Sequence, residues 1–266
     1  MVSKDLDEFA PVSLNGKTAL VRKRFANVIA AALMTGEGCE HTGVAGRGDI
    51  LRFVLEDRGG YGLIRRYRRG GVVRHFMTDT YLAANRPLRE LRVMEYAYKA
   101  GLSVPEPLGA CWQRTGLFIR GSFSCREVAG RDLQTYLETC LGTVHEDAPE
   151  TLRACGKVVK EMHDSGIYHA DLQLRNVIVS DVKVWLIDFD KAVMAGSVGR
   201  LRRAMNLLRF RRSFMKNGFP VEMFEYVCEG YGEISIPTWL NALYRVRGRV
   251  SDAVSRAGAQ RESRNE

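Results

Sequence analysis

Three polar residues in the second half of the chain are spaced in a way that could support phosphoryl transfer. Asn176 follows Asp171 by five residues, and Asp188 comes directly after the apolar run at 184–187. Phosphoryl transfer needs one carboxylate to orient the attacking hydroxyl and oxygen ligands to hold Mg²⁺ against the phosphates. A loop with Asp171 and Asn176, facing Asp188 from the next hairpin, would supply these groups at one place. The alternative is that they are unrelated loop residues, but their register between strand-like apolar runs favours one site.

The elements around these residues are short strands inside a mostly helical region. The apolar runs at 177–179 and 184–187 predict two strands joined by a turn at 180–181. Residues 151–164 carry apolar side chains at helical spacing, which predicts a buried helix. We expect His169, two residues before Asp171, to be a hydrogen-bonded structural residue that supports the loop rather than a proton carrier.

The first half of the chain is rich in strands. Residues 50–55 and 61–67 predict neighbouring strands of an antiparallel meander, separated by a glycine-containing turn. A helix is predicted over 87–100, ending near a glycine, and one or two further strands over 117–128.

This order predicts an α+β, two-lobed fold, with a small β-rich N-lobe followed by a larger helical C-lobe, and a ligand between them. The predicted divisions are an N-terminal extension at 1–39, an N-lobe at 40–128, a C-lobe at 129–250 and a polar tail at 251–266.

Composition excludes several classes of protein. The chain has 266 residues, a net charge of +9 and no apolar run of the roughly 20 residues that a membrane span needs. Its start lacks the apolar core of a signal peptide, so we expect a cytoplasmic location. The six cysteines form no metal-binding or disulfide pattern. The positive charge indicates an anionic partner such as a nucleotide, a nucleic acid or a phosphate-bearing membrane.

The motif His169-x-Asp171, with Asn176 and a strand ending in Asp188-Phe189, resembles the catalytic and metal loops of the protein-kinase-like superfamily. The resemblance implies that Asp171 is catalytic and that Asn176 and Asp188 bind the metal. It also asks for a cation on the third strand, paired with a glutamate on the next helix.

The basic residue on that strand is an arginine rather than the lysine of the superfamily. Arg65 aligns better than Arg66, and Glu90 is its natural partner, with Glu95 as the alternative. Arginine keeps the charge and can grip phosphate with two nitrogens, but its reach differs from that of lysine.

The remaining nucleotide contacts follow from the resemblance alone. Gly46 and Gly48 give a weak phosphate-loop signal, which a simple hairpin turn would give equally. Adenine is expected against the backbone that connects the lobes, near Glu127 and Val128.

Three features argue against a protein kinase. Asp190 replaces the glycine that would follow Asp188-Phe189, and Gln173 stands where protein kinases have a phosphate-contacting lysine. No Ala-Pro-Glu segment follows, so the chain is too short there for a peptide-docking segment. The substrate is therefore expected to be a small molecule or a sugar.

A closer resemblance covers about 46–216 and is to the bacterial lipopolysaccharide kinases. It is carried by the segments 63–71, 89–91, 101–107, 168–172 and 206–213. It implies ATP- and Mg²⁺-dependent phosphorylation of 3-deoxy-D-manno-octulosonic acid (Kdo) at its 4-hydroxyl, on a Kdo-lipid A precursor at the cytoplasmic face of the inner membrane. Gln173 departs from the asparagine expected in this family, which leaves the exact substrate open.

The segment 199–216 has seven basic residues and no acidic one, interleaved with apolar side chains. Such a helix could lie on an anionic membrane surface, and we expect Arg209, Arg211 and Arg212 to take part. A helix that packs on its own lobe with a solvated basic face is an equal alternative.

Other functions stay open from the sequence. One is another small-molecule kinase of the same fold, either a core heptose kinase or an antibiotic phosphotransferase. A second is a catalytically silent kinase-like binding module, for which Arg65 and Asp190 argue. Nucleic-acid binding is not expected, because no aromatic platform or helix-turn-helix signature accompanies the charge.

Overall fold

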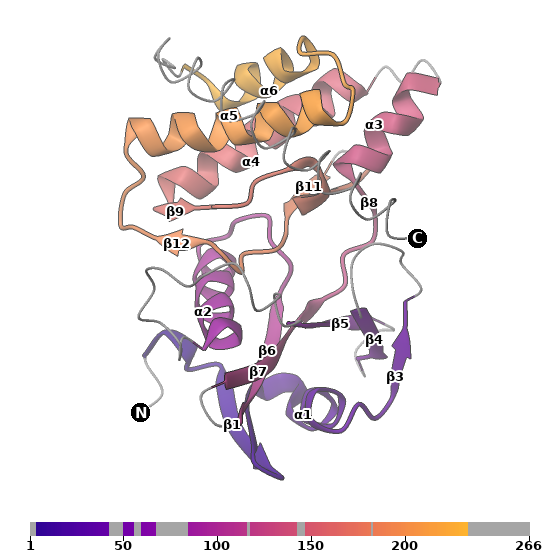
Figure 1. The fold of residues 1–266 in the computed structure, drawn as a ribbon, viewed down its shortest axis with the longest axis vertical. Coiled ribbons are helices and arrows are strands. Elements are labelled where there is room, and N and C mark those ends of the chain that lie inside the picture. The colour runs from indigo at the N-terminus through magenta and orange to yellow at the C-terminus, as the bar shows by residue number, and fades with distance from the viewer. Residues whose placement is uncertain are drawn as a thin grey trace, which may run out of the picture. The chain divides into compact units, whose positions relative to one another are not determined.

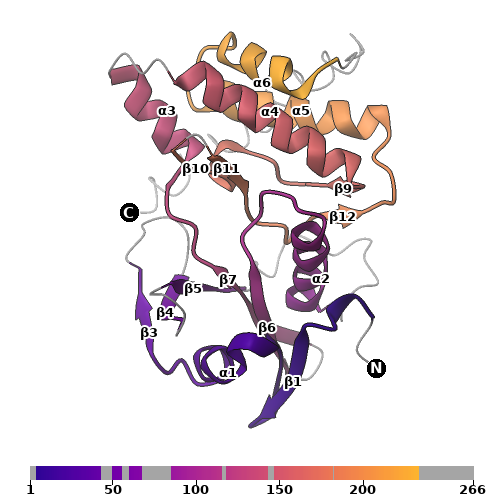
Figure 2. The same cartoon turned by 180° about the vertical axis from the view of Figure 1, so that it is seen from behind.

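The structure is a computed structural model that describes residues 4–42, 50–55, 60–67, 85–115, 118–142, 147–181 and 183–233. The chain divides into two compact units (Figures 1 and 2). The first contains Met1–Gly130 and Trp185–Met194, and the second contains Arg131–Val184 and Ala195–Glu266.

The first unit is built on a seven-stranded sheet in the order β1-β2-β6-β7-β5-β4-β3. Every neighbouring pair of these strands is antiparallel. The strands are β1 (Phe9–Leu14), β2 (Lys17–Arg22), β3 (Cys39–His41), β4 (Ile50–Val54), β5 (Tyr61–Arg66), β6 (Pro107–Thr115) and β7 (Phe118–Arg126). Its helices are α1 (Ala26–Met34) and α2 (Arg86–Lys99), with short 3₁₀ turns at Lys4–Leu6 and Lys23–Phe25. α1 packs on β2 and β6, and α2 packs on β6 and β7.

The N-terminal residues belong to this sheet, which differs from the predicted extension at 1–39. β1 and β2 form a hairpin with Leu14 opposite Lys17. The two residues between them, Asn15 and Gly16, have φ angles of 49° and 73°. Asn-Gly is a strong hairpin signal because both residues tolerate positive φ, and the sequence interpretation overlooked it.

The predicted strands and helices elsewhere are present with small shifts of their ends. The strands expected over 50–55 and 61–67 are β4 and β5, paired antiparallel. The helix expected over 87–100 is α2, which begins at Arg86 behind an Asn85 cap that accepts from Leu88 N.

The second unit is mostly helical. Its helices are α3 (Leu133–Gly142), α4 (Ala148–Asp164), α5 (Arg200–Lys216) and α6 (Met223–Tyr231), with a 3₁₀ turn at Leu174–Asn176. A small sheet in the order β11-β10-β8 contains β8 (Arg131–Asp132), β10 (Val177–Ser180) and β11 (Lys183–Leu186). Two more short strands are β9 (Ile167–Tyr168) in this unit and β12 (Val193–Met194) in the first. No helix among the described residues is long and apolar enough to span a membrane.

Helices α4 and α6 approach each other through glycines on both sides. A Cβ added at Gly156 would lie 2.0 Å from the Val227 carbonyl oxygen, and one added at Gly230 would lie 1.9 Å from the Arg153 carbonyl oxygen. Any larger residue at these positions would therefore push backbone against backbone.

A buried chain of hydrogen bonds connects α4, α5 and α6 of this unit to the loop after β9. Tyr231 Oη lies 2.9 Å from His163 Nδ1, and His163 Nε2 lies 2.9 Å from Asn206 Oδ1. Asn206 Nδ2 donates to the His169 carbonyl at 2.6 Å. Because the Asn206 amide nitrogen is used there, its oxygen must accept, so His163 carries its proton on Nε2 and accepts from Tyr231.

We expect Gly156→Ala to lower the free energy of unfolding by about 1–3 kcal/mol, because overpacking forces the α4 and α6 backbones apart. Urea unfolding of the full chain measures this. Gly199→Ala is the matched control, since no atom lies within 4 Å of the added Cβ. Equal effects of the two substitutions would contradict the close packing.

His163 should make the fold sensitive to acid. Burial lowers its pKa from 6.5 to about 4, so between these pH values the unfolded chain takes up a proton that the folded chain does not. The contribution of His163 to the free energy of unfolding should then fall as pH drops below about 6.5, by about 3 kcal/mol in total, and level off below about 4. In His163→Gln this fall should be absent, although the variant is less stable at neutral pH. Parallel pH profiles for the two proteins would show that His163 does not titrate in this way.

Candidate active site

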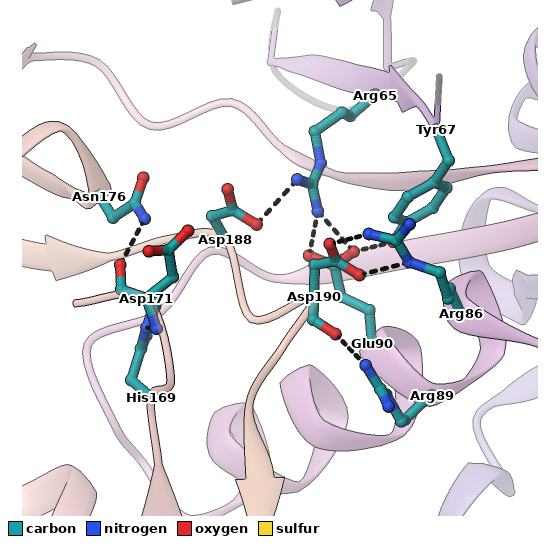
Figure 3. A network of polar contacts seen from close by, with 10 residues as sticks. All are labelled: Arg65, Tyr67, Arg86, Arg89, Glu90, His169, Asp171, Asn176, Asp188 and Asp190. Carbon is teal, nitrogen blue, oxygen red and sulfur yellow. Dashed lines mark hydrogen bonds and ion pairs between the residues drawn. The ribbon is translucent and has the colours of Figure 1, made fainter. Parts of the chain in front are cut away.

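The loop after β9 holds Asp171 and Asn176 together in the second unit. Asn176 Nδ2 donates to the Asp171 carbonyl at 2.8 Å, and the Asp171 N–H donates to His169 Nδ1 at 3.2 Å. His169 is buried, so its ring supports the loop, as the sequence predicted. The Asp171 side chain is 32 % exposed and open to a reactant. These contacts appear in Figure 3.

Asp171 also has a cationic neighbour that the sequence interpretation assigned elsewhere. Arg209 Nη1, on α5, lies 3.6 Å from Asp171 Oδ1. The predicted membrane role of Arg209 stays a prediction, and its guanidinium also lies beside the catalytic candidate.

In the first unit, Arg65 bridges two carboxylates. Its Nη1 donates to Asp188 Oδ1 at 2.7 Å, and its Nη2 lies 2.7 and 2.8 Å from the two Glu90 oxygens. Tyr67 Oη also donates to Glu90 (Figure 3). The ion pair expected between Arg65 and Glu90 is thus present. Glu95, the alternative, pairs with Arg22 instead.

Burial is the largest single influence on the pKa of both Glu90 and Arg65. Burial raises the pKa of Glu90 to about 7, against the opposing effects of Arg65 and Tyr67. Burial works against the charge of Arg65, but Glu90 and Asp188 together raise its pKa above the ordinary value. Arg65 therefore keeps its charge beside these two carboxylates.

The segment after Asp188 is tied to α2. Asp190 accepts from Arg86, whose Nε lies 3.1 Å from Oδ1, and the Asp190 carbonyl accepts from Arg89 at 2.6 Å. Asp188 itself has a φ of 65°, which is costly for a residue with a side chain and needs such support. Sequence reasoning missed Tyr67, Arg86 and Arg89, although the two arginines one helical turn apart beside Glu90 were a usable signal.

The other predicted nucleotide contacts stay predictions. The Glu127 carboxylate accepts from Arg52 at 2.7 and 2.9 Å, and its N–H donates to the Tyr61 carbonyl. Val128 is half-buried beside it. Gly46 and Gly48 lie outside the described residues.

The metal-ligand candidates are chemically suited to Mg²⁺. Asn176 uses its amide nitrogen on Asp171, so its oxygen is the atom that could bind a metal. Asp188 offers carboxylate oxygens, and Mg²⁺ prefers such ligands together with phosphates and water. The described residues contain no group of three His, Cys, Asp or Glu side chains that could hold a metal alone.

Comparisons with known proteins identify the family to which the chain belongs. The chain is 32% identical to a 3-deoxy-D-manno-octulosonic acid kinase of Vibrio cholerae. The matched region covers 58% of this chain and 66% of that protein, which is just under two thirds of its length. It is 31% identical to one of Photobacterium profundum, over 63% and 73%. For one of Actinobacillus succinogenes the identity is 34%, over 58% and 65%.

A solved structure, of WaaP in complex with acyl carrier protein, has the same fold. The TM-score is 0.54 at 15% identity, covering 86% of this chain and 92% of that one. This agrees with the expected α+β kinase-like fold. The profile of the lipopolysaccharide kinase (Kdo/WaaP) family matches residues 45–231, more than half of the chain. The chain belongs to the lipopolysaccharide kinase (Kdo/WaaP) family.

Proposed function

We propose that this protein is an ATP-dependent kinase that phosphorylates the 4-hydroxyl of Kdo on a Kdo-lipid A precursor, in the synthesis of the lipopolysaccharide core. The observation that carries the proposal is the partly exposed Asp171 carboxylate, on a loop whose main chain is held at Asp171 by His169 and Asn176, in a chain of this family. The curated relatives are named for Kdo, which favours Kdo over a core heptose as acceptor.

The reaction would proceed by direct transfer. Asp171 accepts the proton of the sugar hydroxyl as its oxygen attacks the γ-phosphorus of ATP. A new oxygen–phosphorus bond forms, the bond to the bridging β,γ-oxygen breaks, and ADP leaves with that electron pair. Asn176 and Asp188 would hold Mg²⁺, which would neutralise phosphate charge. Arg65 would contact the phosphates from β5, where its guanidinium donates to Glu90 and Glu90 in turn accepts from Tyr67.

The same proposal includes peripheral binding to the anionic cytoplasmic face of the inner membrane. One part of α5 presents exposed cations next to exposed apolar side chains, namely Arg200, Leu201 and Arg202. Each basic residue near an anionic surface contributes about 1 kcal/mol. Arg209 is less suited to test this surface, because its Nη1 also lies 3.6 Å from Asp171 Oδ1.

Asp171→Asn should fold with an unchanged melting temperature but lose about 10²–10⁴-fold in turnover, because the amide cannot accept the hydroxyl proton. Labelled ATP and lipid A precursors with and without Kdo give the measurement, and mass spectrometry locates the phosphate. Near wild-type turnover of the variant would refute the role of Asp171.

Asp188→Ala is a separate test of the metal role. The variant should lose the Mg²⁺-dependent rise in melting temperature that ATP gives the wild type, because a ligand that binds only the folded state stabilises it. An undiminished rise would exclude Asp188 as a metal ligand.

Replacing both Arg200 and Arg202 with Glu should weaken binding to anionic vesicles by roughly thirtyfold or more, because two surface attractions become repulsions. Sedimentation with anionic and with neutral vesicles measures this. Lys157→Glu, on an exposed position of α4, is the matched control. Equal binding by all three proteins would remove this part of α5 from the membrane contact.

A further inference from the structure

Arg209 is held beside Asp171 by two hydrogen bonds that join α5 to the catalytic loop. One turn before it, Asn206 donates to the His169 carbonyl at 2.6 Å. One turn after it, Ser213 Oγ accepts from Leu174 N at 3.3 Å. The position of Arg209 relative to Asp171 is therefore set by the fold on both sides.

The contact between Arg209 and Asp171 leaves donor capacity unused. At 3.6 Å the pair is longer than the 2.7–2.9 Å of a charge-assisted hydrogen bond. Arg209 Nε is buried, and among the described residues it has no hydrogen-bond partner. The side chains of Arg209 and Asp171 are 38 % and 32 % exposed, so an incoming molecule can reach both. A partly exposed guanidinium whose contact with the neighbouring carboxylate is as long as 3.6 Å suits an oxyanion that arrives with the substrate.

The acceptor is the reactant that needs this cation. The phosphate-side candidate, Arg65, already has Glu90 and Asp188 around it in the first unit. An octulosonic acid brings its own carboxylate, and only a short carbon chain separates that group from the 4-hydroxyl. Placing this hydroxyl on Asp171 would bring two anions together, which is unfavourable unless a cation lies between them.

We propose that Arg209 binds the carboxylate of the acceptor sugar while Asp171 receives its hydroxyl, and that this contact selects acidic sugars over neutral ones. The inference rests on the proposed function, since it concerns the acceptor of that reaction. A site built to bind a polar group discriminates strongly against an analogue that lacks it, because its own buried groups are then left unpaired.

The test combines a change in the enzyme with a matching change in the substrate. Wild type, Arg209→Met and Arg209→Lys are assayed with the Kdo-lipid A precursor and with the same precursor after reduction of the Kdo carboxyl to an alcohol. Arg209→Met should raise the KM for the acidic acceptor roughly tenfold to a hundredfold, with a smaller change in kcat. With the reduced acceptor, wild type and Arg209→Met should be about equal. With the acidic acceptor, the KM of Arg209→Lys should lie between those of wild type and Arg209→Met, because lysine keeps the charge but not the paired donors of a guanidinium.

Controls separate this role from others. Lys157→Met removes an exposed charge from α4 of the same unit and should behave as wild type with both acceptors. Arg209→Met could lose activity equally with both acceptors and in acceptor-free ATP hydrolysis. That result would mean that Arg209 contacts the phosphoryl group, and it would overturn the inference. Unchanged kinetics would make the ion pair merely structural, which also overturns it.

The two proposals fail differently. If the wild type transfers no phosphate to the Kdo precursor, the proposed function is wrong. If it transfers phosphate but Arg209→Met discriminates between the two acceptors as the wild type does, only the role of Arg209 is wrong. Melting temperatures of all variants are measured alongside, and Arg209→Lys still decides the question if Arg209→Met does not fold.

Discussion

The candidate catalytic residue, Asp171, lies on a loop that is joined to α5 by a buried hydrogen bond from Asn206 to the His169 carbonyl. A buried carbonyl left without a partner costs about 1–3 kcal/mol. The position of the loop is therefore coupled to the position of α5. The orientation of Asn206 is fixed in turn by His163, and that of His163 by Tyr231. Asp171 is therefore placed by the packing of three helices, although it lies on a loop.

The first unit holds several charged side chains close together, and these side chains are buried or partly buried. A guanidinium can donate to Asp188 and Glu90 at once because its nitrogens point in different directions, whereas an ammonium is a point charge. The carboxylate at Asp190, where a glycine was expected, gives Arg86 on α2 a group to bind. Substitutions that looked like departures from the kinase pattern thus form one connected network.

Much of the fold and part of the candidate site could be predicted because they depend on local sequence patterns. Strand and helix periods gave β4, β5, α2 and α4, and the spacing from His169 to Asn176 identified a loop that the structure does close on itself. The Asn15-Gly16 hairpin was equally local and was overlooked. The partners of Asp190 and of His169 could not be found in this way, because they come from helices far away in the sequence. The basic pattern predicted a membrane role for Arg209, but it could not show that Arg209 also lies near Asp171, on the side of α5 that carries Asn206 and Ser213.

The same turn of α5 carries both the anchor of the loop and the proposed acceptor contact. Asn206 and Arg209 are three residues apart, so a rotation or slide of the helix would displace both together. A lineage that came to use a different sugar could therefore not do so by moving this helix without losing the geometry proposed for proton removal. It would have to exchange individual side chains along a fixed backbone, which makes the residue at 209 an informative position at which to compare enzymes with acidic and neutral acceptors.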